Sequence, residues 1–403
     1  MLIGMTDLEK PGREKSLWSI PRPMMAALLI SAALCLALAS LTYGTNDVLF
    51  FQSYVAKAAH DGTAALYRHG ANLVAYHPEW VEPMAHPPAM LTLWRAVQYL
   101  ENVSGIPFRF WFRLLTIMAH LASAVFVWRL ATAKAAIYYV LCPAAIMIAG
   151  FHGNSDPLLV VMLLASVYAA ECQCRPGLSG VLFGIACSIK LWPLCLVLAF
   201  MLGLKTWRDR LHFGALALVV VATTALPHIL ADPRLIISCV LGYRSNSGLW
   251  GLSQWPSYVR IGVPVTFSVI AIAVVYLRKR NASLTYMVGS SIILFLVLTP
   301  GFGVQYLAWI LPFCFLFGGQ TTNAVYVASS VFLAVIYTYW SGGIPWYFAD
   351  ALRQHNGYEV VVYFAAVCWV TLAVSAVRAV IGRFRHSTAG LSRSGRLSPH
   401  ALG

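Results

Sequence analysis

Charged side chains are scarce in this sequence. Of its 403 residues, 10% are charged and 60% are hydrophobic, and the mean hydropathy is +0.72. A soluble domain carries roughly 25% charged residues, so this chain cannot cover a water-facing surface of ordinary size. Apolar runs long enough to cross a bilayer, about 20 residues each, occur from one end of the chain to the other. The composition therefore predicts an integral membrane protein and excludes a large soluble domain.

Several well-known signatures are also missing. The sequence contains no P-loop, no H-E-x-x-H metal motif and no G-x-S-x-G nucleophile elbow. Its nine cysteines are scattered, mostly inside apolar runs, and the pair Cys172-x-Cys174 has no matching second pair. We therefore predict neither a zinc site nor a disulfide framework.

Negative charge is the scarcer sign, with 14 acidic against 28 basic residues and a net charge of +14. In a soluble protein this excess would suggest a nucleic-acid partner. Here the basic residues cluster at the ends of apolar runs, as the positive-inside rule describes. We therefore predict contact with membrane lipids, no nucleic acid, and cytoplasmic N- and C-termini.

The apolar runs predict an all-α, polytopic fold with about 11–12 transmembrane segments. The expected segments are residues 24–42, 110–128, 133–150, 157–173, 177–204, 211–230, 258–277, 284–299, 303–318, 323–341 and 358–380. The first run is too long for a signal peptide, and no small-residue cleavage site is obvious, so we expect an uncleaved helix. The membrane domain then covers residues 24–382, between a cytoplasmic tail, 1–23, and a basic, disordered cytoplasmic tail, 383–403.

The segment 177–204 does not fit a single crossing. Arg175 and Lys205 flank it, and its interior carries Lys190-Leu-Trp-Pro193. A single span would put one basic end outside, whereas two short helices that enter and return keep both ends inside. Because proline removes a backbone donor and can break a helix, we favour the broken or re-entrant arrangement over one kinked helix.

This topology gathers polar residues on the extracytoplasmic face. The stretches on that face are residues 43–109, 150–157, 231–257, 299–305 and 341–357, and eight of the fourteen acidic residues fall in them. The large first loop, 43–109, is long and rich in aromatic residues, so we expect short amphipathic helices at the membrane interface rather than disorder. The active face is therefore predicted to be extracytoplasmic.

Asp47 is the first candidate for chemistry, because it lies about one helical turn past the first predicted span. A carboxylate that close to hydrocarbon is partly desolvated, which would raise its pKa and its basicity. Such a base could accept a proton from a sugar hydroxyl, a contribution of roughly 10²–10⁴ in rate. The alternative is that Asp47 only caps the following helix, and position alone does not separate the two.

Two polar elements at the same face are also candidates. In Gly150-Phe-His152-Gly-Asn154-Ser-Asp156, three side chains close together could bind hydroxyls or a phosphate, although Ser155 or Asp156 could simply cap the next helix. His86 precedes two prolines and is a further candidate. The alternative is that these prolines mark the start of a helix and that His86 has no other role.

Two further elements interrupt apolar segments. A lysine such as Lys190 deep in a bilayer costs about 2.5–3.5 kcal/mol on insertion scales, so it needs an anionic partner such as a lipid phosphate, or else it snorkels to the interface. Gln305 and Tyr306 lie in Thr299-Pro-Gly-Phe-Gly-Val-Gln305-Tyr306, where irregular backbone could line a water-filled cavity. A plain helical hairpin turn is the competing interpretation.

The order of these elements resembles the GT-C superfamily of membrane glycosyltransferases. The matching features are Asn46-Asp47 with a large first outer loop that ends in His-Pro-Pro, the His152-Gly-Asn-Ser-Asp156-Pro element, Gly184-Ile-Ala-Cys-Ser-Ile-Lys190-Leu-Trp-Pro193, and Thr299-Pro-Gly-Phe-Gly-Val-Gln305-Tyr306-Leu-Ala-Trp309. Within the superfamily the chain is most similar to the bacterial alpha-mannosyltransferases of glycosyltransferase family 87, over roughly residues 24–320. It also resembles the first mannosyltransferase of glycosylphosphatidylinositol synthesis.

The resemblance implies an inverting transfer of a hexose such as mannose, from a polyprenyl-phosphate donor to a lipid or glycan acceptor. Asp47 would be the general base, in a bacterial inner (plasma) membrane, with no nucleotide or other cofactor. The implied substrate-binding residues are Asn46, His86, His152, Asn154, Asp156, Lys190, Gln305 and Tyr306. Of these, Lys190 and Gln305 would approach the donor phosphate. The outer loop has one acid near the helix end rather than an adjacent acidic pair, so no metal is predicted.

Two other classes remain as alternatives. A flippase or transporter of a lipid-linked sugar or small solute would also need Lys190 in a polar cavity, but it would not need Asp47 as a base. Such transporters usually show paired halves with corresponding broken helices, and the chain has no clear internal repeat. An O-antigen polymerase or ligase would carry its large outer loop late in the chain, whereas here the first loop is the largest.

Overall fold

The computed structural model describes residues 20–73, 77–242, 247–353 and 355–381. The predicted C-terminal tail, and most of the N-terminal one, lie outside these ranges. Within them, six helices are long and apolar enough to cross a membrane: α1 (Arg22–Leu41), α5 (Phe108–Leu130), α11 (Trp207–Ala231), α13 (Pro256–Lys279), α16 (Gly319–Ser341) and α17 (Tyr358–Ile381). A seventh span results if α6 (Ala133–Val140) and Pro143–His152, bent by 58°, cross together.

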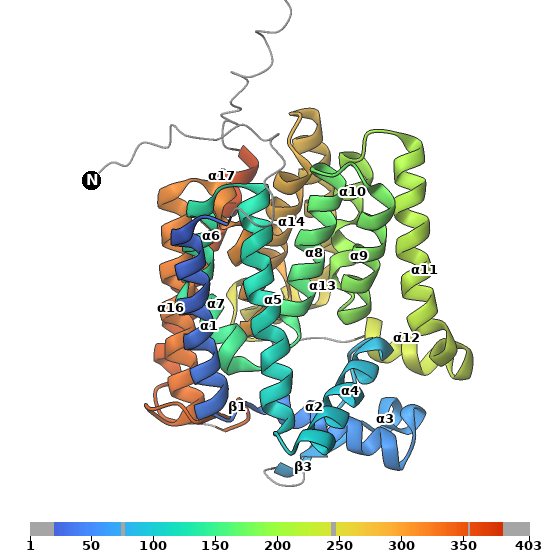
Figure 1. Cartoon of the computed structure of the whole chain (residues 1–403), viewed down its shortest axis with the longest axis vertical. Helices are drawn as coiled ribbons and strands as arrows, with labels where there is room; N and C mark the ends of the chain where they lie inside the picture. The colour runs from blue at the N-terminus through green and yellow to red at the C-terminus, as the bar shows by residue number, and fades with distance from the viewer. Residues whose placement is uncertain (1–19, 74–76, 243–246, 354, 382–403) are drawn as a thin grey trace, which may run out of the picture.

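The remaining predicted segments correspond to shorter or broken helices. These are α8 (Asp156–Glu171), α9 (Pro176–Ile189), η3 (Trp192–Leu196) with α10 (Val197–Gly203), α14 (Leu284–Leu298), and η5 (Val304–Tyr306) with α15 (Leu307–Ile310) and η6 (Leu311–Phe317). The chain is therefore an all-α, polytopic membrane protein (Figure 1). The predicted count of about 11–12 segments is reached only when these short helices are included.

The segment around Lys190 has the broken, re-entrant form. At the C-terminal end of α8, Glu171 accepts a hydrogen bond from the Thr285 amide at 2.8 Å. Gly203, which ends α10, lies beside Leu284, so close that an added β-carbon would be 2.9 Å from that side chain. Lys190, at the break, instead contacts Asp156 at the opposite end of α8. The segment thus breaks at Lys190, and its second half returns to the end of α8 from which it started. The predicted break is confirmed, and the re-entry of this segment into a membrane stays a prediction.

Several long helices present apolar surface to the outside of the bundle. Of the 25 residues of α11, only Phe213 is buried, although the helix is apolar along most of its length. A water-soluble protein does not expose apolar surface on this scale. The exposed face of α11 is therefore suited to contact lipid chains.

The large first loop forms a layer of short elements at one end of the bundle (Figure 1). Its elements are β1 (Gly44–Thr45), α2 (Asn46–His60), α3 (Thr63–His69), β2 (Ala71–Leu73), β3 (His77–Glu82) and α4 (Pro88–Ser104). The helices α2 and α4 pack through their apolar faces, where the Phe51 and Trp94 rings stack with centroids 4.4 Å apart. The predicted short amphipathic helices are therefore present, and their position at a membrane interface stays a prediction.

Two small sheets fix this layer in place. The antiparallel pair β2–β3 closes the loop on itself, with Ala71 opposite Glu82. The parallel pair β1–β4 joins Gly44–Thr45 to β4 (Phe348–Ala349), in the connection between α16 and α17. The helix α12 (Pro233–Leu241) and η4 (Gly251–Gln254) complete the same end of the bundle. The start of α2 is thereby held against both early and late parts of the chain.

Candidate active site

The turn before α2 places Asp47 against the end of a π-helix, η2 (Met147–His152), a rare element that often occurs at functional sites. The Thr45 hydroxyl donates to the His152 carbonyl at 2.6 Å. Gly44 has φ of +97°, and an added β-carbon would lie 2.7 Å from the Phe151 carbonyl oxygen, so this close approach requires glycine. The main chain itself therefore brings Asp47 to His152.

Arg113 joins the C-terminal end of α1 to η2 from within the bundle. Its guanidinium, fully buried, donates to the carbonyl oxygens of Ala39 and Thr42 at 2.8 and 2.7 Å and to the Thr42 hydroxyl at 2.9 Å. It also reaches the Gly150 carbonyl at 3.5 Å. The carbonyls at the C-terminal end of α1 carry the negative pole of the helix dipole, so they stabilise a buried cation without a carboxylate partner.

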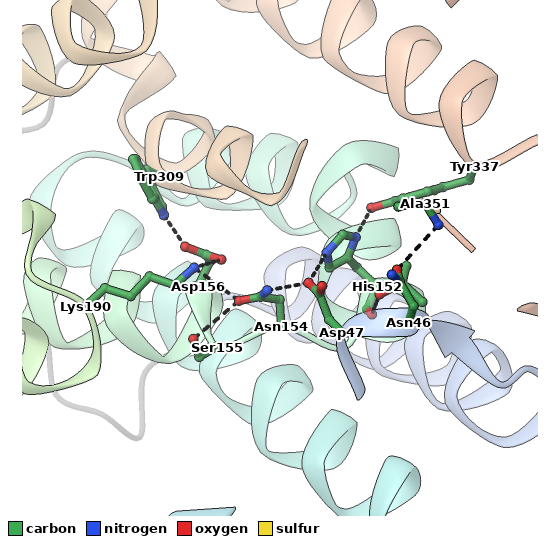
Figure 2. Close-up of polar contacts among 11 residues, drawn as sticks. Asn46, Asp47, His152, Asn154, Ser155, Asp156, Lys190, Trp309, Tyr337 and Ala351 are labelled. Carbon is green, nitrogen blue, oxygen red and sulfur yellow. Dashed lines mark hydrogen bonds and ion pairs between the residues drawn. The ribbon is translucent and has the colours of Figure 1, made fainter. Parts of the chain in front are cut away.

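Asp47 receives two hydrogen bonds on one carboxylate oxygen (Figure 2). His152 Nε2 lies 3.0 Å from Asp47 Oδ2, and the Asn154 side-chain amide donates to the same atom. The other ring nitrogen, His152 Nδ1, is 2.8 Å from the Tyr337 hydroxyl on α16. Because a tyrosine hydroxyl and a carboxylate occupy its two nitrogens, the buried imidazole has a fixed orientation behind Asp47.

The pKa of Asp47 differs from the sequence expectation. Burial raises the pKa of this carboxyl, but the hydrogen bonds from His152 and Asn154, together with the charges of His152 and Lys190, outweigh burial. The pKa of Asp47 is consequently lowered from 3.8. The expectation of a raised pKa was wrong, because it considered desolvation and not the donors that surround the group. Asp47 is ionised at neutral pH and can accept a proton.

Lys190 forms the second charged centre of the site (Figure 2). Its ammonium lies 2.8 Å from Asp156 Oδ2 and 3.2 Å from Asn154 Oδ1, and 5.4 Å above the Tyr306 ring. Asp156 is fully buried in the first turn of α8, and the Trp309 indole donates to its other oxygen. The anionic partner expected for Lys190 is therefore Asp156, and the snorkelling alternative is wrong.

Asp47 and Lys190 open into one cavity of about 870 Å³. Six of the nine predicted site residues line it, namely Asp47, His86, Asn154, Lys190, Gln305 and Tyr306. The other three lie behind the surface. Among them, His152 bonds to Asp47, and Asp156 pairs with Lys190. Asn46 is buried and accepts a 3.5 Å bond from the Ala351 amide. The structure thus gathers elements from across the chain into one site.

Sequence reasoning missed several residues of this cavity. Glu82, Tyr54 and Arg260 line it. The Trp309 indole donates to Asp156, and the Tyr337 hydroxyl bonds to His152, which in turn bonds to Asp47. A signal for Arg260 was available, because a basic residue at the predicted extracytoplasmic end of a span opposes the positive-inside pattern. No motif marked Glu82.

Within the described ranges, no group of three or more His, Cys, Asp or Glu side chains is arranged to hold a metal ion. An ionised carboxylate faces a roomy cavity, a lysine and an arginine line the same cavity, and apolar side chains form part of its wall. This arrangement can deprotonate a hydroxyl and bind an anionic group at the same time.

Three comparisons with known proteins give one family match and solved structures of low similarity. No curated protein matches the chain. Among solved structures, ArnT from Cupriavidus metallidurans in the apo state is similar at a TM-score of 0.47 and 14% identity, and the same protein bound to undecaprenyl phosphate at 0.43 and 13%. Each similarity covers 89% of this chain and 76% of that one, and at these TM-scores neither assigns a role to a residue here. Residues 85–237 match the model of glycosyltransferase family 87, and this match confirms the predicted resemblance to that family.

Proposed function

We propose that the protein is a membrane glycosyltransferase that moves a sugar from a polyprenyl-phosphate donor to a hydroxyl of a lipid or glycan acceptor. The sugar is mannose or another hexose, and the transfer inverts the anomeric carbon. One observation carries the proposal: the ionised carboxylate of Asp47 faces a cavity of about 870 Å³ that also contains Lys190. The base can accept the proton that the acceptor hydroxyl releases, and the cation can stabilise the negative charge on the departing phosphate.

Asp47 acts as the general base. Both of its hydrogen bonds reach Oδ2, and no hydrogen bond from the described residues reaches Oδ1, which is left to accept a proton. The acceptor oxygen attacks the anomeric carbon and transfers its proton to Asp47. As the new C–O bond forms, the bond to the phosphate oxygen breaks, and its electron pair leaves with the polyprenyl phosphate. Proton transfer of this kind contributes roughly 10²–10⁴ in rate.

The donor phosphate lies on the side of the cavity that carries Lys190 and Arg260. Because Lys190 already shares its charge with Asp156, the exposed Arg260 near the start of α13 supplies the additional positive charge. Val263 and Phe267, on the same helix, line the cavity and are about half exposed at 51% and 45%. They offer an apolar path from the phosphate side toward the lipid.

The membrane placement follows the charge pattern. We propose a bacterial inner membrane, with both termini cytoplasmic and the site on the extracytoplasmic face. Three basic clusters support this orientation, namely Arg175, Lys205 and Arg278–Arg280. Arg175 lies at the ends of α8 and α9 opposite to Asp156 and Lys190, and Arg278–Arg280 lie at the end of α13 opposite to Arg260.

Asp47→Asn tests the proposal. Purified protein in lipid nanodiscs would be given polyprenyl-phosphate-mannose with mixed lipid and glycan acceptors, and release of polyprenyl phosphate would be followed. We expect the variant to lose about 10²–10⁴ in rate with unchanged thermal unfolding. Asp61→Asn, at the exposed C-terminal end of the same helix, is the matched control and should keep full activity.

Other results would redirect the assignment. Equal release by wild type and Asp47→Asn would remove Asp47 from the chemistry. No release with any donor would favour the alternative, a flippase or transporter of a lipid-linked sugar or small solute.

A further inference from the structure

The cavity has two walls of different charge. The bundle wall carries the cations Lys190 and Arg260, whereas the loop wall carries Glu82 and His86 from the connection between β3 and α4. Asp47 belongs to α2, as do Phe50 and Tyr54 of the loop wall, and it reaches the bundle wall through Asn154. The cavity therefore receives its cations from the bundle and its carboxyl groups, Asp47 and Glu82, from the first loop.

Glu82 is held in position by its neighbours. It ends β3 opposite Ala71, and its carbonyl lies so close to Gly70 that an added β-carbon would be 2.4 Å away. The Trp80 indole donates to Glu82 Oε2 at 3.0 Å. On the next residue, the Pro83 carbonyl accepts a bond from the Tyr54 hydroxyl at 3.1 Å. The carboxyl is thus placed on the cavity wall before any ligand arrives.

His86 is similarly fixed, and one of its polar atoms has no partner. Its carbonyl accepts a bond from the Tyr67 hydroxyl at 2.7 Å, and its ring packs edge-on against Phe51 and Trp94. His86 Nδ1 is buried and lacks a hydrogen bond among the residues described. Burial, with a smaller contribution from Lys190, lowers the pKa of His86 to about 3, so the ring is neutral and offers hydrogen bonds rather than charge.

The electrostatics of this wall disfavour a further anion. Burial raises the pKa of the Glu82 carboxyl, the Trp80 bond opposes this, and the nearby Asp47 charge raises the pKa again. Asp47 and Glu82 therefore repel additional negative charge on the loop side. A carboxyl oxygen and a neutral imidazole instead suit an uncharged ligand with hydroxyl groups.

We propose that Glu82 and His86 form the acceptor subsite, and that the part of the acceptor bound there is an uncharged carbohydrate. The assignment as an acceptor subsite rests on the proposed transferase function. The carbohydrate lies on the loop wall with its reacting hydroxyl toward Asp47, while the anionic donor phosphate lies toward Lys190 and Arg260. Attack and departure then occur from opposite sides of the anomeric carbon, as an inverting transfer requires.

Binding of matched ligands tests the subsite without any turnover. The probes are hexyl glucoside, hexyl mannoside and hexyl galactoside, each paired with the hexyl uronide that differs by one carboxylate. Affinities would be measured in nanodiscs from the dependence of thermal unfolding on ligand concentration. We expect at least one hexoside to stabilise the wild type with about tenfold or greater preference over its uronide, since a second carboxylate a few ångströms from an ionised one is disfavoured by about this factor or more.

Glu82→Gln assigns the effect to the residue. We expect this variant to bind the preferred hexoside about tenfold more weakly and to lose most of the discrimination against the uronide. Glu101→Gln removes the same charge from α4, at a residue outside the cavity lining, and should bind as the wild type does. In turnover assays the Glu82 change should raise the KM for the acceptor and leave the KM for the donor unchanged.

Three results would overturn the inference: binding of neither ligand of any pair, equal binding of hexoside and uronide by the wild type, or wild-type affinity in Glu82→Gln. Because these measurements need no donor, they are independent of Asp47→Asn. Selective hexoside binding together with no transfer would keep the carbohydrate subsite and reject the transferase.

Discussion

Removing the imidazole behind Asp47 should shift the pH dependence of the reaction. In His152→Leu the carboxylate loses the bond from Nε2 at 3.0 Å, while its burial remains. A hydrogen bond to a charged group is worth about 1.5–3 kcal/mol, and each pKa unit corresponds to about 1.4 kcal/mol. The pKa of Asp47 should therefore rise by about one to two units from its lowered value in the wild type.

The sign of the effect follows from the proposed role of Asp47 as a general base. The base is active when ionised, so the rate falls as the pH drops through its pKa. In the wild type this acidic limb lies below the ordinary carboxyl value of 3.8. In His152→Leu it should move upward, so that the variant loses activity at an acidic pH where wild type retains it, and differs less at neutral pH.

The assay is kcat/KM for polyprenyl-phosphate release in nanodiscs across the acidic range. His152→Gln also removes the imidazole but keeps an amide that can donate to Asp47, so it should restore most of the wild-type limb. Tyr337→Phe, which removes the hydroxyl 2.8 Å from the other ring nitrogen, should shift the limb less than His152→Leu. An unchanged or downward-shifted limb in a folded His152→Leu protein would refute this account of the pKa.

Two further substitutions test the charged groups around the site. Lys190→Met should raise the donor KM and cost about 3–5 kcal/mol of stability, because it leaves Asp156 buried and uncompensated. Adding Asp156→Asn should recover thermal stability but not donor affinity, and recovery of both would contradict the phosphate role. Arg113→Met should lower the free energy of unfolding by about 3 kcal/mol or more, because several buried carbonyls lose their donor; Arg113→Lys should recover only part, having fewer donors, and wild-type stability in either variant would refute this role of Arg113.

Hydropathy was sufficient to predict the helical segments, since each apolar run from residue 24 to residue 380 corresponds to a helix or a broken helix. The break at Lys190-Leu-Trp-Pro193 was also predictable, because charge on both flanks and a proline inside leave few alternatives. Among site residues, Asp47, Asn154 and Lys190 could be named, because polar side chains next to apolar runs are conspicuous.

What could not be predicted depends on contacts between distant parts of the chain. The pairing of Gly44–Thr45 with Phe348–Ala349 joins segments some 300 residues apart, and neither is recognisable as a strand by itself. The π-helix that presents His152 ends at Gly153, where φ of +76° and contact with Val48 require glycine. The pKa of Asp47 was missed for the same reason, since its donors come from a segment more than 100 residues away.

Asn154 shows why the two charged centres of the site keep a fixed relation. Its amide nitrogen donates to Asp47, and its amide oxygen accepts from Lys190. The reverse orientation would place an oxygen against a carboxylate and a donor against an ammonium, so the two charges together select one orientation of the side chain. The chain of contacts continues to Asp156, which neutralises Lys190 and accepts a hydrogen bond from Trp309. One neutral side chain thus sets the distance between the base and the cation, and it does so with elements that the membrane bundle already holds rigid. A donor phosphate bound near Lys190 and a hydroxyl near Asp47 would then meet in a geometry that is set before either substrate binds.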